Sequence, residues 1–123
     1  MYTRDPRRSN GTVIQIRAAG AIPEHRFVAP NRQLCGAGGY AIGVTGTRGA
    51  ATAGELADLV IDGVWYVEAG AAIAAGAVVA SDANGRAVPH TSGTKIGVAL
   101  AAADAPVGTS YQLVPVLRTP GLP

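Results

Sequence analysis

The chain has 123 residues, of which 48% are hydrophobic, 15% charged and 5% aromatic, with 17 glycines, 8 prolines and a net charge of +2. This length accommodates one domain of ordinary size, and the charged fraction is well below the roughly 25% of average soluble domains. The Val, Ile and Leu content is too high for a disordered chain. The composition therefore indicates a compact, turn-rich chain of small apolar residues that relies on neighbours to cover its surface.

The charge is unevenly distributed along the chain. Residues 1–32 hold six arginines against two carboxylates, so they carry +4, and residues 33–123 carry −2. The total is too small to indicate nucleic-acid binding, and no aromatic residues are interleaved with the arginines to stack on bases. We expect no nucleic-acid partner, and we expect a binding surface in residues 1–32, which we call the basic front.

The first ten residues are polar, rich in arginine and interrupted by Pro6. They predict an extended arm that becomes ordered on a partner. The arm lacks the apolar stretch of a signal peptide, and no apolar run reaches the roughly 18 residues of a membrane span. We therefore expect a soluble protein made in a cytoplasm, with no membrane partner.

The body of the chain is predicted to begin at Gly11 with three short strands. Residues 12–17, 26–29 and 40–45 have the β-branched content of strands. The segment between the second and third strands, residues 30–39, has no periodicity and several glycines, which predicts a loop.

Asp62-Gly63 lies between the apolar runs 59–61 and 64–67. Asp-Gly between β-forming runs favours a type I′ hairpin turn, in which both central residues have positive φ. The alternative is a helix from Thr52, because Thr52 and Glu55 match a capping box. The β-branched and aromatic content after Asp58 favours the hairpin.

The second half of the body predicts four more strands. Residues 77–80 and 86–88 flank a turn-forming cluster and form a second hairpin, and 95–100 and 111–118 follow. Ile73, in a small Ala-Gly turn, is expected to plug the core. Pro115 cannot donate to a ladder, so the last strand is predicted at a sheet edge or bulged. About eight short strands predict an all-β, single-domain β-barrel or β-sandwich over residues 11–118, followed by an irregular tail over 119–123.

The residues that carry enzyme chemistry form no recognisable constellation. Neither His25 nor His90 has metal-ligand spacing, and both are expected on the surface or in loops. Cys35 is the single cysteine and is interpreted as a small buried hydrophobe. The glycine runs match neither a dinucleotide-binding nor a P-loop motif. We predict no catalytic, cofactor-binding or metal-binding residues, and no enzyme activity.

A different class of function is suggested by Lys95, the single lysine. It lies near a predicted hairpin, so the alternative is a small β-barrel carrier or ligand-binding domain, lipoyl- or biotinyl-like and modified at Lys95. The modified lysine of such domains stands at a turn apex, whereas Lys95 opens a predicted strand.

The order of turns and strands from Gly54 to Leu117 resembles the small capsid decoration, or cement, proteins of tailed bacteriophages, a family often described as a domain of unknown function. The chain departs from the family pattern at Ala77, where an acidic residue is usual, and the resemblance does not cover the first 50 residues. The matching pieces are residues 54–70, 73–79, 82–88, 96–103 and 108–109, then the closing apolar strand.

This resemblance implies a non-enzymatic virion structural protein, made in the host cytoplasm, that binds the outer surface of an icosahedral capsid. It implies bridging of neighbouring major capsid protein subunits, and copies that cluster as trimers rather than dimers. We predict that the arm and the loop over residues 30–39 contact the capsid, since arginines pair with carboxylates and a free segment can add to a sheet edge. The predicted contact residues are Tyr2, Arg4, Arg7, Arg8, Asn31 and Arg32.

Overall fold

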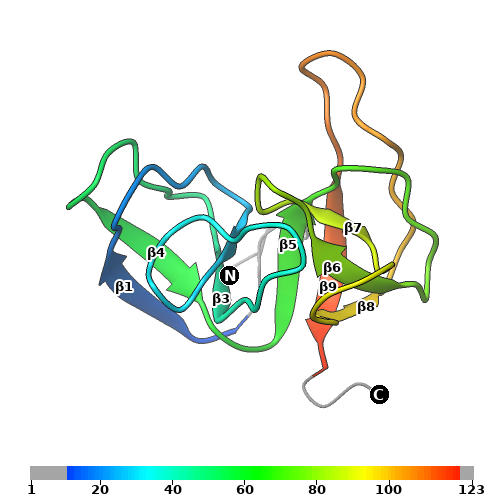
Figure 1. The fold of residues 1–123 in the computed structure, drawn as a ribbon, viewed down its shortest axis with the longest axis horizontal. Coiled ribbons are helices and arrows are strands. Elements are labelled where there is room, and N and C mark those ends of the chain that lie inside the picture. The colour runs from blue at the N-terminus through cyan, green and yellow to red at the C-terminus, as the bar shows by residue number, and fades with distance from the viewer. Residues whose placement is uncertain (1–10, 120–123) are drawn as a thin grey trace, which may run out of the picture.

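The computed structural model describes residues 11–119 and shows an all-β fold of nine strands, with no helix among those residues (Figure 1). The strands form two antiparallel sheets, one of four strands and one of five. They are β1 (Val13–Arg17), β2 (Phe27–Val28), β3 (Gly43–Thr45), β4 (Leu56–Val60), β5 (Val64–Glu68), β6 (Val78–Ser81), β7 (Ala87–Pro89), β8 (Gly97–Ala99) and β9 (Leu113–Arg118).

The four-stranded sheet has the order β1-β4-β3-β2 and contains the first half of the chain. Successive side chains of β4 point to opposite faces, and the apolar residues after Leu56, which is exposed, are buried on both faces. Ala57 and Leu59 pack with Ile22 and Val28 in one cluster, whereas Val60 belongs to a second cluster shared with the other sheet. The sheet is therefore covered on both faces except at β1, which is largely exposed.

The five-stranded sheet has the order β5-β9-β8-β6-β7. Trp65, Val67, Val114 and Val116 project from β5 and β9 into its core. A single bridge between Ala69 and Ala87 joins the ends of the two edge strands, so the sheet curls around that core without closing into a barrel.

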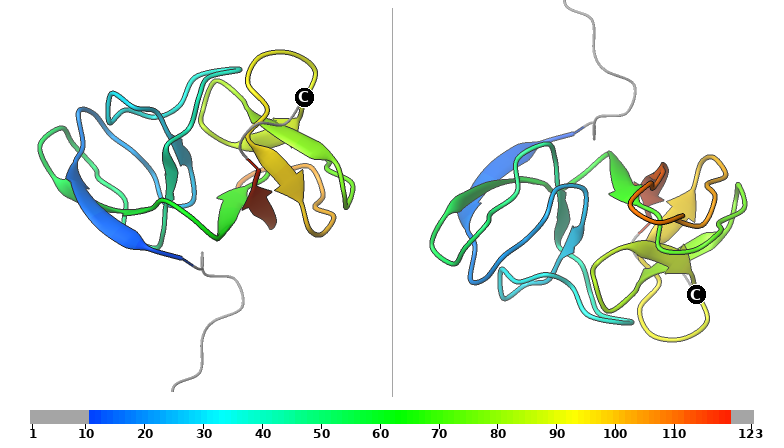
Figure 2. Two further views of the ribbon diagram at one scale, coloured as in Figure 1. Left: turned by 90° about the horizontal axis from the view of Figure 1, so that it is seen from below. Right: turned by 90° about the horizontal axis from the view of Figure 1, so that it is seen from above.

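The two sheets lie side by side and share one apolar core (Figure 2). Phe27, Val44 and Val60 stand opposite one another across β2, β3 and β4, and all three belong to the same cluster as Trp65. The Phe27 and Trp65 rings meet edge to face, with centroids 6.2 Å apart, a preferred geometry for aromatic pairs. This contact fixes one sheet against the other.

The prediction of a hairpin at Asp62-Gly63 is wrong. β4 and β5 are strands, but they do not pair, because β4 lies between β1 and β3 while β5 pairs with β9. Gly63 has φ 81°, whereas Asp62 is not among the residues with positive φ, so the turn is not type I′. The segment is the connection between the two sheets. Asp62 accepts hydrogen bonds from the Thr12 amide at 2.6 Å and the Thr12 hydroxyl at 3.1 Å.

The alternative of a helix from Thr52 is also wrong, although its capping residue is used. The Glu55 Oε1 accepts hydrogen bonds from the amides of Ala51 and Thr52, at 2.6 and 2.9 Å. Gly54 has φ 89°, which ends the turn before β4 begins.

The second hairpin is confirmed, since β6 and β7 pair antiparallel. Its turn is closed by Asp82, whose Oδ1 accepts from the amides of Asn84 and Arg86 at 2.8 and 2.9 Å. Gly85 takes the positive φ of 72° that the turn requires. Ile73 is buried in the core, as predicted.

The prediction that Pro115 places the last strand at an edge or bulges it is wrong, because β9 lies between β5 and β8 and its register with β5 is unbroken through Pro115. The Pro115 carbonyl accepts from the Leu100 amide at 2.8 Å, so the main-chain groups of Pro115 face the β8 side. There β8 has already ended at Ala99. The N–H that Pro115 lacks would therefore lie beyond the end of the pairing between β8 and β9. For this reason β9 tolerates a proline although it lies inside the sheet.

Candidate functional site

The outer edge of β1 is an open strand edge. Thr12 accepts from the Ile61 amide, and the Ala18 amide donates to Glu55, so the even-numbered residues of this segment direct their main-chain groups to β4. The odd-numbered residues direct theirs outward. The outward groups of Val13 and Gln15 have no hydrogen-bond partner among residues 11–119. An edge of this kind can accept a further strand from another chain.

Three arginines lie at the end of β1. The Arg32 Nη1 donates to the Arg17 carbonyl at 3.0 Å, and the Arg17 Nη1 donates to the Gly54 carbonyl at 3.0 Å. Arg17 and Arg48 line an open pocket of about 320 Å³ at the start of β4. We call Arg17, Arg32 and Arg48 the basic end.

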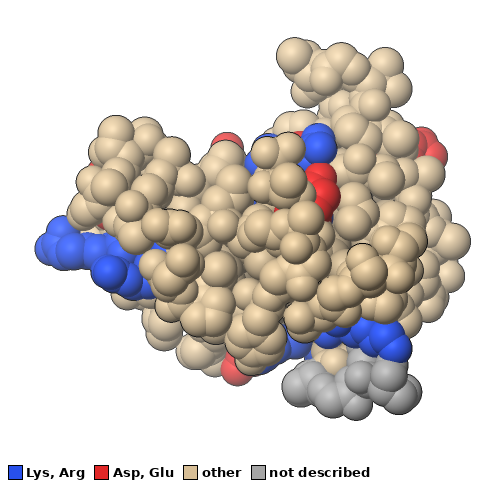
Figure 3. All heavy atoms as spheres, viewed as in Figure 1, with Lys and Arg blue, Asp and Glu red and all other residues tan. Residues whose placement is uncertain are grey.

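Within the described part of the chain, no carboxylate lies within ion-pair distance of any arginine of the basic end. Glu55 lines the same pocket, but its carboxylate accepts two main-chain hydrogen bonds. Figure 3 shows basic side chains gathered at the end of the molecule that the four-stranded sheet occupies, on the left. Guanidinium groups whose charge is not matched by a carboxylate are suited to carboxylates of a partner.

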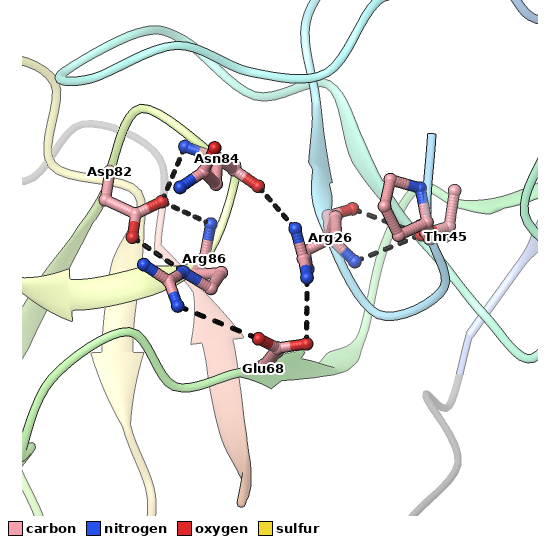
Figure 4. Close-up of polar contacts among 7 residues, drawn as sticks. Arg26, Thr45, Glu68, Asp82, Asn84 and Arg86 are labelled. Atoms are coloured by element: carbon pink, nitrogen blue, oxygen red, sulfur yellow. Dashed lines mark hydrogen bonds and ion pairs between the residues drawn. The ribbon is translucent and has the colours of Figure 1, made fainter. Parts of the chain in front are cut away.

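A network of four charged residues joins the two sheets (Figure 4). Glu68, at the end of β5, accepts from the Arg26 Nη2 at 3.0 Å, and its other oxygen lies 3.9 Å from the Arg86 Nη1. Arg86 also pairs with Asp82 at 2.9 Å. Arg26 precedes β2 and its Nη1 donates to the Asn84 carbonyl at 2.9 Å. We call these four residues the lock, because their ion pairs connect the two sheets. Arg26, one of the arginines of residues 1–32, is part of it.

A second arginine joins the sheets on the side of β9. Arg118 lies over the Trp65 ring, 5.6 Å from its centroid. Its Nη1 donates to the Ile61 carbonyl at 3.2 Å and its Nη2 to the Tyr40 hydroxyl at 3.1 Å. Stacking over the tryptophan face adds a cation–π contribution.

The groups that catalyse reactions in other proteins are not brought together among residues 11–119. Cys35 is fully buried in the core, as predicted, and burial raises the pKa of its thiol against a weaker opposing effect of a hydrogen bond with Ser81. A thiol with a raised pKa is a poor nucleophile. No group of three or more His, Cys, Asp or Glu side chains in this range could hold a metal ion, and no helix there could cross a membrane.

The two histidines take different positions. His90 is half-buried, and its Nε2 lies 3.1 Å from the Gly93 carbonyl. His25 lies in a turn with φ 57°, which agrees with the expectation of a surface or loop position, but its side chain is buried and not on the surface. The turn directs its backbone inward, where its carbonyl accepts from the Glu68 amide at 2.9 Å.

Lys95 does not occupy the apex of a hairpin. It lies in the connection from β7 to β8, two residues before β8, and these two strands do not pair because β6 lies between them. The swinging arm of a carrier domain needs its lysine at the tip of a turn, so this position does not fit the carrier alternative.

The predicted contact residues fall into two groups. Tyr2, Arg4, Arg7 and Arg8 lie outside the described residues. Asn31 and Arg32 are exposed in the loop before Leu34. Arg32 belongs to the basic end, with φ 64°, whereas the Asn31 side chain forms hydrogen bonds with Gln33, two residues further along the loop. Sequence reasoning missed Arg17 and Arg48, because only the fold brings residues 31 positions apart to one pocket.

The described residues form an all-β fold with an open strand edge and surface arginines that have no ion-pair partner among those residues. No reactive groups are assembled among them. These are features of a protein that acts by binding another protein. A comparison with protein families identifies which class of binding protein this is. The model of the phage cement proteins matches residues 8–113, so the chain belongs to the phage cement protein family. It is a phage virion structural protein that associates with the capsid.

Two further comparisons were made. The chain is similar in fold to the head fiber gp8.5 N base in bacteriophage phi29, with a TM-score of 0.58 and 21% sequence identity over 88% of this chain and 93% of that one. A search of curated protein sequences found no match. The family match begins at residue 8, so it includes most of the first 50 residues that the sequence resemblance left out.

Proposed function

We propose that this protein is a non-enzymatic decoration protein that binds the outer surface of the assembled capsid and stabilises it by bridging neighbouring major capsid protein subunits. The family match over residues 8–113 is the observation that carries this proposal. The open edge of β1 and the basic end supply the contacts. A strand of the capsid protein adds to the outward groups of Val13 and Gln15, and capsid carboxylates pair with Arg17, Arg32 and Arg48.

The arm over residues 1–10 continues these contacts. It leads directly into Gly11 and β1, and it carries Arg4, Arg7 and Arg8. Bridging requires one decoration protein to touch two capsid subunits, and an arm that becomes ordered on a partner reaches further than the folded surface alone. Copies of the protein associate as trimers, so each weak contact with the capsid is repeated and the total affinity rises.

Co-sedimentation with expanded, empty capsids tests this proposal. The full chain is compared with a chain that lacks residues 1–10 and with an Arg17→Glu/Arg48→Glu variant. We expect each change to weaken binding at least tenfold, and we expect wild-type binding to weaken as salt is raised, because exposed charges are screened.

The matched control is Lys95→Glu, which reverses the charge of a half-buried cation outside the four-stranded sheet and is expected to leave binding within twofold of wild type. Undiminished binding by the double variant would remove the basic end from the contact. A wild-type chain that does not sediment with capsids at all would overturn the proposed function.

A further inference from the structure

The outward surface of the five-stranded sheet carries an apolar row that crosses four strands. Val64 stands opposite Leu117, Leu117 opposite Val98, and Val98 opposite Val78. Residues in register project from the same face of a sheet. Two residues further along the strands, Pro115 and Leu100 project from this face as well. We call these six residues the outer apolar face.

In the described part of the chain, the outer apolar face belongs to neither of the two hydrophobic clusters. The opposite face, with Trp65, Val114 and Val116, already forms the core. An antiparallel sheet with one face in a core normally presents polar residues on the other. The six residues named here are apolar, and Tyr66, opposite Pro115, projects from the same face beside them. Leu117 is 43% exposed and Leu100 51%, and the other four are half-buried. Such a pattern is typical of a sheet that is covered on both faces.

A projecting loop extends the outer apolar face beyond the sheet. Residues 100–112 connect β8 to β9. The base of this loop is bridged to Ile73 through Ala103, and its tip projects from the rest of the molecule (Figure 1). Val107, at the tip, is 78% exposed. In Figure 3 the tip of the loop, at the top right, shows neither basic nor acidic side chains.

Hydrogen bonds hold this loop in shape although it buries little. Val107 and Ser110 exchange main-chain hydrogen bonds of 3.0 and 2.9 Å. Nearer the sheet, the Asp104 amide donates to the Gln112 side chain at 2.8 Å, and the Gln112 Nε2 donates back to the Asp104 carboxylate at 3.1 Å. A loop that is organised before binding loses less conformational entropy when it binds.

We infer that the outer apolar face and the tip of the projecting loop are the surface through which copies of this chain associate. This inference deepens the proposed function and rests on it, since it specifies how decorating copies meet. The face is uncharged, and charge complementarity therefore favours a partner surface that is also uncharged. For this reason we assign a second copy of the chain as the partner. A second copy presents that surface at equal concentration, as symmetric oligomers do.

Two other candidate partners for this face, the arm and the capsid surface, fit it less well. The arm over residues 1–10 carries three arginines and one aspartate, and these charges would lose hydration on an apolar surface. The outside of a capsid must remain soluble before decoration, so it is not expected to offer a large uncharged apolar patch. The basic end, on the other sheet, is the part suited to that partner.

The mass of the full chain in solution tests this inference. Light scattering coupled to size exclusion is measured for wild type and for Leu117→Lys at protein concentrations up to about 100 μM, the range in which moderate apolar interfaces assemble. We expect wild type at a multiple of the 12.3 kDa chain mass, three copies for a trimer. The variant is expected at a single chain mass, since it places a charge in the centre of the face.

Two controls keep the test decisive. Val13→Lys introduces the same charge at an exposed aliphatic residue of the other sheet and is expected to keep the wild-type mass. Leu117→Gln, together with thermal unfolding of every variant, separates lost association from lost folding. Wild type at a single chain mass, or a folded Leu117→Lys protein at the wild-type mass, would overturn the inference. A monomeric wild type that still sediments with capsids would overturn the inference and the proposed trimer, and would leave capsid binding by the decoration protein intact.

Discussion

The two sheets of this protein differ in what they leave exposed. Among residues 11–119, the four-stranded sheet presents an open strand edge and three arginines that form no ion pair. The five-stranded sheet presents an uncharged apolar face and a projecting loop with an exposed valine at its tip. The shared core is apolar on both sides. The difference between the sheets therefore lies in the outer surfaces, and it divides the molecule into a part suited to a charged partner and a part suited to its own copies.

The largest expected effect tests whether the two sheets unfold together. Trp65 belongs to the five-stranded sheet but packs edge to face on Phe27 of the other. Trp65→Ala is expected to lower the free energy of unfolding by about 4 kcal/mol, the usual cost of deleting a buried aromatic side chain. Denaturant unfolding followed by circular dichroism should still show one transition. Two separated transitions would mean that the sheets are independently stable.

The ion-pair network between the sheets gives the next largest effect. Glu68→Ala leaves Arg26 and Arg86 partly buried without their shared carboxylate. We expect a loss of about 3 kcal/mol, since removing one partner of a buried pair exposes the desolvation cost of the other. The measurement is again denaturant unfolding. The control is Glu24→Ala, an exposed carboxylate, which is expected to change stability by less than about 0.5 kcal/mol. Equal effects of the two substitutions would contradict the role of the lock.

A pair of proline substitutions on β1 separates folding from binding. Ile16 directs its N–H to β4, so Ile16→Pro is expected to cost about 3 kcal/mol of folding stability. Gln15 directs its N–H outward, where proline is tolerated on an edge strand, so Gln15→Pro is expected to cost less than about 1 kcal/mol. The same Gln15→Pro protein should lose at least tenfold in capsid co-sedimentation, because the added strand loses a hydrogen bond. Full binding by folded Gln15→Pro would exclude strand addition at this edge.

The smallest expected effect concerns pH. Burial raises the pKa of Cys35 above its usual value of 9.0, so the folded state favours the neutral thiol. This contribution to stability is fully present below pH 9.0 and is lost as the pH rises through the folded-state pKa. The free energy of unfolding should therefore fall more steeply above pH 9.0 in wild type than in Cys35→Ala. Parallel pH profiles for the two proteins would contradict this.

Local patterns predicted the strands well, because β-branched runs between turn residues specify extended structure without knowledge of partners. The turn after β6 was predictable for the same reason, since Asp82 closes it through hydrogen bonds to residues two and four positions away. The pairing of strands was not predictable in this way. Asp62-Gly63 has the composition of a hairpin turn, but β4 gains more by pairing on both sides within the first sheet than by pairing with β5.

The candidate surfaces show the same limit. Arg32 was predicted because it lies in a loop of the basic front. Arg48 could not be, since it reaches the pocket beside Arg17 only after β1 and β4 have paired. Arg26 looked equally available in the sequence, but the fold uses it in the lock with Glu68. The outer apolar face likewise depends on the register of four strands, of which only the pair β8 and β9 are neighbours in both sequence and sheet.

The division of the molecule into two surfaces is tested most directly by a cryo-electron microscopy map of capsids decorated with the full chain. The account predicts that the edge of β1 and the basic end contact the major capsid protein, while Leu117 and Val98 lie between neighbouring copies of the decoration protein. A map in which the five-stranded sheet rests on the capsid and the edge of β1 faces solvent would contradict it.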